Sequence, residues 1–144
     1  MSSSAYEIID TCEKIDFQEV SDLLRYYGLS DLDSDTQRQV FQNSYVTIFV
    51  KKDGELIGVG RAISDGISQG AIYNIAVKDA YRGKGIGKRI VDEILKRLSG
   101  CNVVLYTHPK HIGLYEHWGF RRMSTSYARF PEEKYYEQEG FFRE

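Results

Sequence analysis

A glycine-rich loop with three basic residues is the segment of this sequence whose composition is best suited to binding and chemistry. Residues 81–88 read Tyr-Arg-Gly-Lys-Gly-Ile-Gly-Lys. Glycine has no Cβ, so a ligand can approach the backbone closely and successive N–H groups can point at one anion. A helix starting at the end of the loop would add unpaired N–H donors and a partial positive charge. The loop therefore predicts a phosphate site.

Two regular elements are expected to hold this loop in place. Residues 71–77 are rich in β-formers and come directly before it. From residue 85 to 98 apolar residues recur with the period of a helix, and the opposite face is charged. Because ligands of α/β sheets usually bind at the carboxyl ends of strands, the loop between the strand and the helix lies where a binding site is expected.

The remaining elements follow from periodicity and from turn and capping residues. The expected strands are residues 6–10, 45–51, 56–64, 71–77, 101–107 and 120–130. The expected helices begin after the Asp16 cap and end at Gly28, then run over 34–43, 85–98 and 109–118. Asp53 and Gly54 form a two-residue hairpin turn, the most reliable local feature.

These elements predict a mixed α/β (α+β) sheet in a single domain of residues 1–144, with an acidic aromatic tail at 132–144. Three strands, 45–51, 56–64 and 71–77, would form an antiparallel meander. The helix that follows would cross over to the strand at 101–107. A right-handed crossover places that strand parallel to the one ending at Val77.

Composition excludes several classes of protein. Hydrophobic residues make up 42% and charged residues 28%, with a formal net charge of −2. This balance gives no broad basic field, so we expect no nucleic-acid partner. Cys12 and Cys101 are far apart and read as free thiols, and no metal-ligand spacing is visible. Without a leader-like start in residues 1–5 or an apolar run of about 20 residues, we expect a cytoplasmic protein with no membrane partner.

Two familiar phosphate-binding motifs do not fit the loop. A mononucleotide P-loop needs Ser or Thr after its Lys, whereas Arg89 follows Lys88. A dinucleotide site needs Gly-x-Gly-x-x-Gly and an acidic residue near the end of the next strand. Here the third glycine comes one position early, and Tyr106-Thr107 supplies no acid.

Arg82, Gly85 and Gly87 instead resemble the Arg/Gln-x-x-Gly-x-Gly/Ala motif of the GNAT superfamily of N-acetyltransferases. Residues 113–120, Gly-Leu-Tyr-Glu-His-Trp-Gly-Phe, are similar to the family's later aromatic-Tyr-Glu-x-x-Gly-Phe segment. The order of elements from residue 6 to about residue 130 also fits. The resemblance implies the GNAT acyl-CoA N-acyltransferase fold, in which the central parallel pair of strands splays apart. It also implies acetyl-CoA as cosubstrate, no metal, and a primary amine as acceptor.

The resemblance also assigns roles to residues. It places the diphosphate of coenzyme A on Arg82, Gly83, Lys84, Gly85, Ile86, Gly87 and Lys88. The pantetheine arm would pair with the strand at Ile75, Ala76 and Val77. Tyr115 matches the tyrosine that protonates the leaving thiolate. Transfer would proceed by direct attack of the amine in a ternary complex.

The sequence leaves the general base and the acceptor open. Family members often carry a carboxylate or histidine on the central strand, where this chain has Tyr73 and Asn74. Substitutes by residue type are Asp65, His108, His111, Glu116 and His117. A noncatalytic acyl-CoA-binding or sensor module is therefore the alternative function. The aromatic tail is expected to fold over the acceptor side or to pack against a second subunit in a homodimer.

Overall fold

The computed structural model describes residues 5–143. These form two compact units, one ending at Leu105 and one beginning at Tyr106. Expectations for residues 1–4 and for the last residue of the tail, Glu144, lie outside the described residues. No helix of the described chain is long and apolar enough to cross a bilayer.

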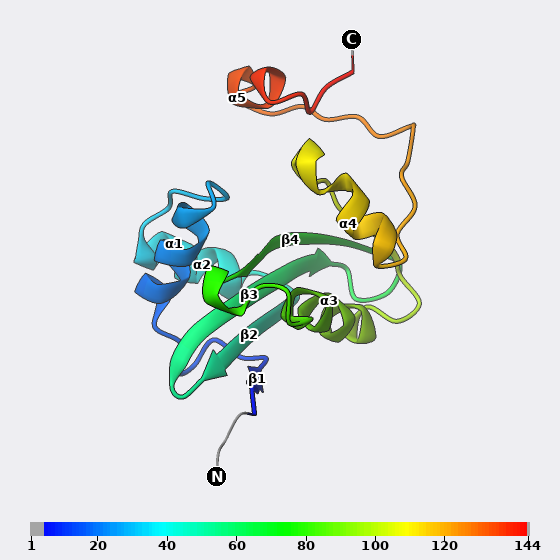
Figure 1. The fold of residues 1–144 in the computed structure, drawn as a ribbon. Helices are drawn as coiled ribbons and strands as arrows, with labels where there is room; N and C mark the ends of the chain where they lie inside the picture. The colour runs from blue at the N-terminus through cyan, green and yellow to red at the C-terminus, as the bar shows by residue number, and fades with distance from the viewer. Residues whose placement is uncertain (1–4, 144) are drawn as a thin grey trace. The chain divides into compact units, whose positions relative to one another are not determined.

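The first unit is built on a five-stranded sheet in the order β1-β2-β3-β4-β5 (Figure 1). The strands are β1 Glu7–Ile9, β2 Val46–Lys52, β3 Glu55–Ser64, β4 Gln69–Val77 and β5 Asn102–Val104. The first four pair antiparallel with their neighbours, and β4 pairs with β5 in parallel. The mixed sheet and its single parallel pair confirm the expected fold class.

Two helices with side-chain caps precede the β2–β3 hairpin. They are α1, Phe17–Tyr26, and α2, Ser34–Gln42. The side chain of Asp16 accepts a hydrogen bond from the N–H of Gln18, and Asp33 caps α2 in the same way. The predicted turn at 53–54 joins β2 to β3, with Lys52 opposite Glu55.

The helices α1 and α2 share an apolar core with one face of the sheet. Phe17 meets Phe41 and Phe49 edge-on, with ring centroids 5.7 and 5.9 Å apart. The buried members of this cluster are Ile15, Phe17, Val20, Leu23, Leu24, Phe41, Phe49, Leu56, Val59 and Ala76. The end of α1 is thereby fixed against the strands that carry the expected site.

Helix α3, Ile86–Arg97, packs closely on β3 because β3 carries glycine where the two meet. A Cβ added at Gly60 would lie 2.6 Å from both Ile75 Cδ1 and Ile90 Cγ2. One at Gly58 would lie 3.0 Å from Ile90 Cδ1. The absence of side chains at these positions sets how near α3, and hence its N-terminus, approaches the sheet.

The second unit consists of short helices joined by irregular chain. Its elements are the 3₁₀ turn η2, Pro109–His111, then α4, Ile112–His117, and α5, Lys134–Gln138. Phe130 lies at its aromatic centre, with ring centroids 4.5 Å from Tyr136, 5.5 Å from Tyr106 and 6.0 Å from Phe142. The aromatic residues of the tail thus pack within their own unit. No described residue after Leu98 is fully buried.

Two strand predictions need correction. The expected strand at 120–130 is irregular in the structure, and residues 121–129 are exposed. The apolar residues at its ends are instead half-buried by aromatic contacts: Phe120 lies 5.8 Å from Tyr115, and Phe130 belongs to the tail cluster. The strand expected at 101–107 is regular only at Asn102–Val104 and is not buried. A β-forming composition makes a strand only where a neighbour pairs with it, and that condition cannot be read locally.

Candidate functional site

The glycine-rich loop connects β4 to α3 as expected. β4 ends at Val77, the 3₁₀ turn η1 covers Asp79–Tyr81, and Gly85 is the N-cap of α3. Gly83 and Gly85 have φ angles of +77° and +81°, in the left-handed region that favours glycine. A Cβ at either position would meet no described atom within 4 Å. The turn therefore requires glycine for its backbone conformation, and the space above it is open to a ligand.

The N-terminus of α3 presents backbone donors at this loop. The N–H of Arg89 makes the first helical hydrogen bond, 3.0 Å to the carbonyl of Gly85. The N–H groups of Ile86, Gly87 and Lys88 precede it and have no acceptor within the helix, and no side chain caps the helix at Gly85. Together with the helix dipole, these donors suit an anion.

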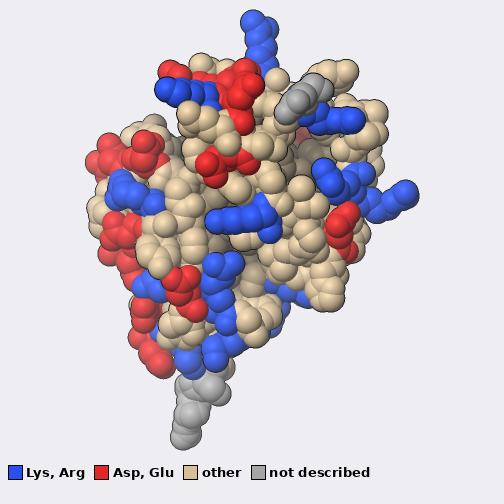
Figure 2. Space-filling view, turned by 45° about the horizontal axis from the view of Figure 1, so that its top comes forward, with Lys and Arg blue, Asp and Glu red and all other residues tan. Residues whose placement is uncertain are grey.

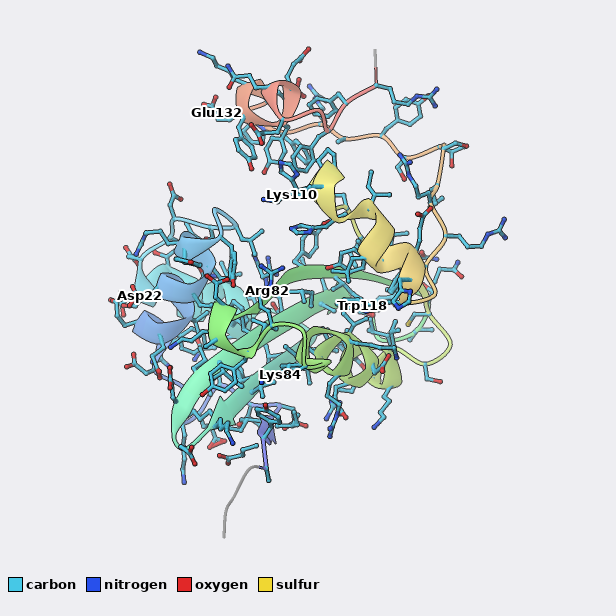
Figure 3. The ribbon with its side chains drawn as sticks, viewed as in Figure 1. Asp22, Arg82, Lys84, Lys110, Trp118 and Glu132 are labelled. Carbon is cyan, nitrogen blue, oxygen red and sulfur yellow. The ribbon has the colours of Figure 1, made fainter. Side chains whose placement is uncertain are left out.

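The basic side chains of the loop and of the start of α3 differ in their ion pairs; Figure 3 labels Arg82 and Lys84. The guanidinium of Arg82 is half-exposed and lies 3.9 Å from the carboxylate of Asp79. Lys84 is exposed, and it makes no ion pair with the described residues. Lys88 pairs with Asp92 one turn along α3 at 2.8 Å. Such an exposed pair is worth only about 0.3–0.5 kcal/mol, so a bound anion could compete for Lys88.

The charge that favours an anion is local. The face shown in Figure 2 carries both basic and acidic side chains. This agrees with the formal net charge of −2. Attraction at the loop must therefore come from its own backbone donors and from the basic side chains beside them.

One edge of β4 is open beside the loop. The N–H of Lys78 bonds to the carbonyl of Ile57 on β3 at 2.8 Å, so the polar groups of Val77 point away from β3. The carbonyl of Val77 accepts a hydrogen bond from the Tyr27 hydroxyl at 2.6 Å. β5 pairs with β4 only as far as Ala71, and the rest of that edge has no strand partner among residues 5–143. An amide-containing ligand could pair with this edge.

A bulge in β4 lies within this open stretch. Two residues, Asn74 and Ile75, stand opposite Gly60, and Asn74 has φ +61°. Arg61 on β3 donates from Nε to the side-chain oxygen of Asn74 at 2.6 Å, which holds the bulge. Bulges re-aim side chains and are common near active sites. An Asn inside a β-rich run was the signal that could have revealed it from sequence.

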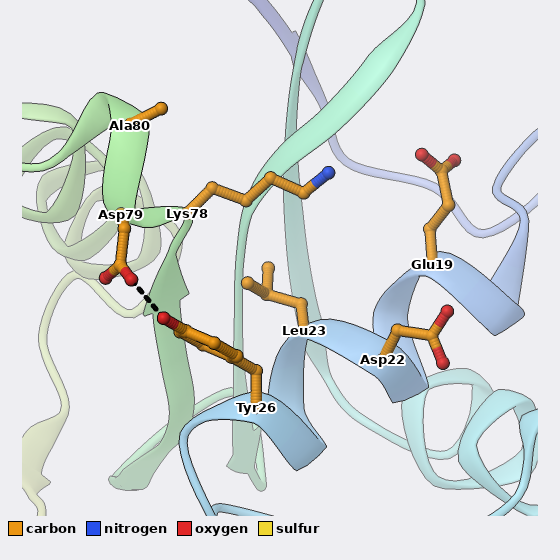
Figure 4. A pocket seen from close by; sticks show the side chains of 7 residues that line it. All are labelled: Glu19, Asp22, Leu23, Tyr26, Lys78, Asp79 and Ala80. Atoms are coloured by element: carbon orange, nitrogen blue, oxygen red, sulfur yellow. Dashed lines mark hydrogen bonds between the residues drawn. The ribbon is translucent and has the colours of Figure 1, made fainter.

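A hollow of about 390 Å³ lies on the α1 side of the loop (Figure 4). Its lining residues are Glu19, Asp22, Leu23, Tyr26, Lys78, Asp79 and Ala80. Three of these are carboxylates, and the single ammonium, on Lys78, is paired with Glu55 at 2.6 Å. A diphosphate would be repelled here, so the glycine-rich loop is the better anion site.

Tyr115 lies on α4 in the second unit. Its ring is half-buried and packs against Trp118 and Phe120, with centroids 5.3 and 5.8 Å away. This burial raises the pKa of the Tyr115 phenol above its usual range. The phenol therefore keeps its proton at neutral pH, as a proton donor must.

Two of the residues considered as a base are committed to structural hydrogen bonds. Asp65 accepts from the N–H groups of Ile67 and Ser68 at 2.8 and 2.7 Å, and hydrogen bonds from Ser68 hold the pKa of its carboxyl far below the usual range. His108 caps η2 by accepting from the N–H of Lys110 at 3.2 Å, and its Nε2 lies 2.8 Å from Glu139. Asp65 is therefore a weak base, and both ring nitrogens of His108 are engaged in hydrogen bonds.

Sequence reasoning missed a group of residues beside the loop. The hydroxyls of Tyr26 and Tyr27, at the end of α1, both donate to Asp79 of η1. More than 50 positions separate the two segments, so no local pattern links them. Adjacent tyrosines directly before the helix-ending Gly28 were the only signal in the sequence.

The described residues contain no group of three or more His, Cys, Asp or Glu that could hold a metal ion. Cys12 and Cys101 are both free and half-buried, as expected from their spacing. The features that the structure brings together are thus a strand edge, a bulge and a basic loop at a helix N-terminus.

Comparison with known proteins shows which proteins this chain resembles. Residues 43–122, more than half of the chain, match the acetyltransferase (GNAT) domain. GCN5-related N-acetyltransferase 1, chloroplastic, from Arabidopsis thaliana is 22% identical over 125 residues, which cover 83% of this chain. The match spans 64% of that relative, slightly less than two thirds of its length.

Solved structures share the fold. A probable acetyltransferase from Staphylococcus aureus has a TM-score of 0.77 at 22% identity, covering 89% of this chain and 99% of that one. AAC(6')-Iy in complex with the bisubstrate analog CoA-S-monomethyl-acetylneamine has a TM-score of 0.68 at 16% identity, covering 91% and 99%. With the strand edge, the loop and the matched domain in agreement, the chain belongs to the GNAT acetyltransferase family.

Proposed function

We propose that this chain transfers an acetyl group from acetyl-CoA to a primary amine. The observation that carries the proposal is the meeting of the β4 edge, which β5 pairs only as far as Ala71, with the unpaired N–H groups at the start of α3. A linear ligand with amides followed by a diphosphate matches both features in that order. The AAC(6')-Iy complex holds a CoA derivative on a similar fold.

The chain's own groups divide the binding between them. Backbone donors from Gly83 to Lys88 and the guanidinium of Arg82 hold the diphosphate. The edge of β4 from Ile75 to Val77 orients the pantetheine arm, and the bulge at Asn74 aims that arm along the gap where β5 leaves β4. Because these contacts are mainly to backbone, the shape of the strand and loop matters more than side-chain identity.

Acetyl-CoA supplies an activated thioester, and the protein must manage two protons. The amine has to be neutral to attack, although an alkyl ammonium such as lysine has a pKa of about 10.4. A bond forms between the amine nitrogen and the carbonyl carbon while the C–S bond breaks. The nitrogen then loses a proton to solvent, the sulfur receives one from Tyr115, and the Tyr115 phenolate regains a proton from solvent. The products are an acetamide and the CoA thiol.

The nature of the amine is the part that needs experiment. We would measure acetyl-CoA binding by calorimetry, then CoA release with polyamines, arylalkylamines, amino sugars and peptides. We expect binding with a 1:1 stoichiometry and stimulation of CoA release by one class of amine. Folded protein that gives no heat and no thermal protection with acetyl-CoA would overturn the proposal. Tight binding without any stimulated release would favour the noncatalytic sensor instead.

Two further expectations remain proposals. A cytoplasmic location is expected from the sequence, while the relative from Arabidopsis thaliana carries the word chloroplastic in its name. A homodimer is the second, and it no longer needs the aromatic tail as its contact, since the tail packs within its own unit. Sedimentation of the purified chain would test it.

A further inference from the structure

Two tyrosines at the end of α1 hold a carboxylate at the entrance to the glycine-rich loop. The Tyr27 hydroxyl donates to Oδ1 of Asp79 at 2.7 Å. The Tyr26 hydroxyl donates to the other oxygen, Oδ2, as Figure 4 shows. Each oxygen of this carboxylate therefore lies within hydrogen-bonding distance of a different tyrosine hydroxyl, and Tyr27 shares its single proton between Asp79 and the carbonyl of Val77.

The Arg82 guanidinium lies beside this group, where it contacts the Tyr27 side chain and forms only a long ion pair with Asp79. Its guanidinium carbon is 5.4 Å from the centre of the Tyr27 ring. The distance between the guanidinium and the Asp79 carboxylate, from Nη1 to Oδ1, is 3.9 Å, which is too long for a hydrogen bond. An arginine beside a carboxylate commonly forms two parallel hydrogen bonds. Here the hydroxyls already occupy the carboxylate, and Arg82 does not form that close paired contact with it.

We propose that Tyr27, helped by Tyr26, keeps Arg82 available to the diphosphate of acetyl-CoA by occupying Asp79. The inference rests on the proposed function, because it concerns the same loop. Tyr27 is a positioning residue, since it touches Asp79 and not the ligand. Without its hydroxyl, the carboxylate can turn towards Arg82, and the ion pair, which is long in the intact protein, would shorten and compete with the diphosphate for the guanidinium.

Tyr27 is better held than Tyr26 and should have the larger effect. It is half-buried against the α1 core, and its hydroxyl also reaches the carbonyl of Val77 at 2.6 Å. Tyr26 is 67% exposed, and besides its bond to Asp79 it meets the Tyr27 ring edge-on, with centroids 4.9 Å apart. Tyr27 thus links the edge of β4 to the loop, whereas Tyr26 secures the outer oxygen.

The first test is calorimetric titration of acetyl-CoA into Tyr27→Phe, which keeps the ring and removes the hydroxyl. We expect binding about tenfold weaker, in line with loss of a hydrogen bond to a charged group. The melting temperature should fall by no more than about 3 °C. Tyr45→Phe, an exposed tyrosine elsewhere in the same unit, is the matched control and should bind as the wild type does.

The second test asks whether the effect passes through Asp79. Asp79→Asn keeps an acceptor of nearly the same shape and removes the charge that attracts Arg82. In that background, adding Tyr27→Phe should weaken binding by less than about twofold. A full tenfold loss there would overturn the inference, as would wild-type affinity in Tyr27→Phe alone.

Tyr26→Phe tests the other oxygen at an exposed position where folding is not at risk. About threefold weaker binding is expected from the loss of one partly solvated hydrogen bond. No change in either tyrosine variant, with normal binding by the wild type, would overturn this inference and leave the proposed function standing. No binding by the folded wild type would overturn both.

Discussion

The two units of this chain are stabilised by different kinds of side-chain packing. Residues up to Leu105 bury an apolar core on both sides of a sheet, with Leu24, Phe49 and Ile90 fully covered. Residues from Tyr106 onward contain no fully buried side chain among those described and are held by contacts between half-buried aromatic rings. The loop proposed to bind acetyl-CoA therefore lies on a well-packed scaffold, while the proposed proton donor Tyr115 lies on a lightly packed one. We therefore expect mutations in the first unit and in the second unit to affect acetyl-CoA binding and acetyl transfer differently.

The largest effect is expected at the loop. Gly85→Val should abolish measurable acetyl-CoA binding, a loss of at least about 100-fold, because a branched side chain is strained at φ +81° and would occupy the space proposed for the ligand. Calorimetry would measure this. Gly100→Val is the matched control: its φ is +86°, it also faces open space, and it lies at the other end of α3. Both should lose about 1–2 kcal/mol of stability through backbone strain, but only Gly85→Val should lose affinity.

The contrast in packing predicts the next effect. Leu24→Ala should lower the free energy of unfolding by about 3 kcal/mol, since Leu24 is fully buried and its removal leaves a cavity. Leu114→Ala, at a position 38% exposed on α4, should cost less than about 1 kcal/mol. Urea denaturation followed by circular dichroism would compare them. Equal losses would mean that the second unit is packed as firmly as the first.

Removing the proposed proton donor should separate catalysis from binding. We expect Tyr115→Phe to lower kcat about 100-fold, the usual scale for loss of a general acid. The affinity for acetyl-CoA should stay within about twofold, because Tyr115 is not part of the loop. Tyr127→Phe, fully exposed in the same unit, is the control. An unchanged kcat in Tyr115→Phe would remove this residue from the mechanism.

The smallest effect concerns acid stability of the first unit. Hydrogen bonds from Arg97 and Lys96 lower the pKa of Glu93 to about 2. Because the folded pKa lies below the unfolded one, the stabilisation is complete above about pH 4.5 and is lost as the pH falls towards 2. Glu93→Gln should therefore lose about 1–2 kcal/mol at pH 7, and less at pH 3. Glu116→Gln, exposed on α4, should lose nearly nothing at either pH. A loss for Glu93→Gln that is independent of pH would show that charge is not the cause.

Local signals explain which parts of the structure could be read from the sequence. The 53–54 turn, the apolar stripe of α3 and the loop between β4 and α3 each depend on neighbouring residues, and all three are found. The bulge at Asn74 depends on Arg61 from the next strand, and the Tyr27–Asp79 bond joins segments 52 positions apart. The false strand at 120–130 had suitable residues but no pairing partner. The bulge, the Tyr27–Asp79 bond and the absence of a strand at 120–130 all depend on whether distant segments contact one another.

The close approach of α3 to β3 has a consequence for how variation can be tolerated. A single methyl group at Gly60 would clash with two side chains, Ile75 in the bulge of β4 and Ile90 in the middle of α3. Ile90 is β-branched and cannot easily rotate away inside a helix. A position with no functional group of its own therefore acts as the common spacer for the strand that would align the acyl arm and the helix that would receive the diphosphate. A substitution at Gly60 should therefore displace both the strand and the helix, although it changes no residue that is proposed to contact the ligand.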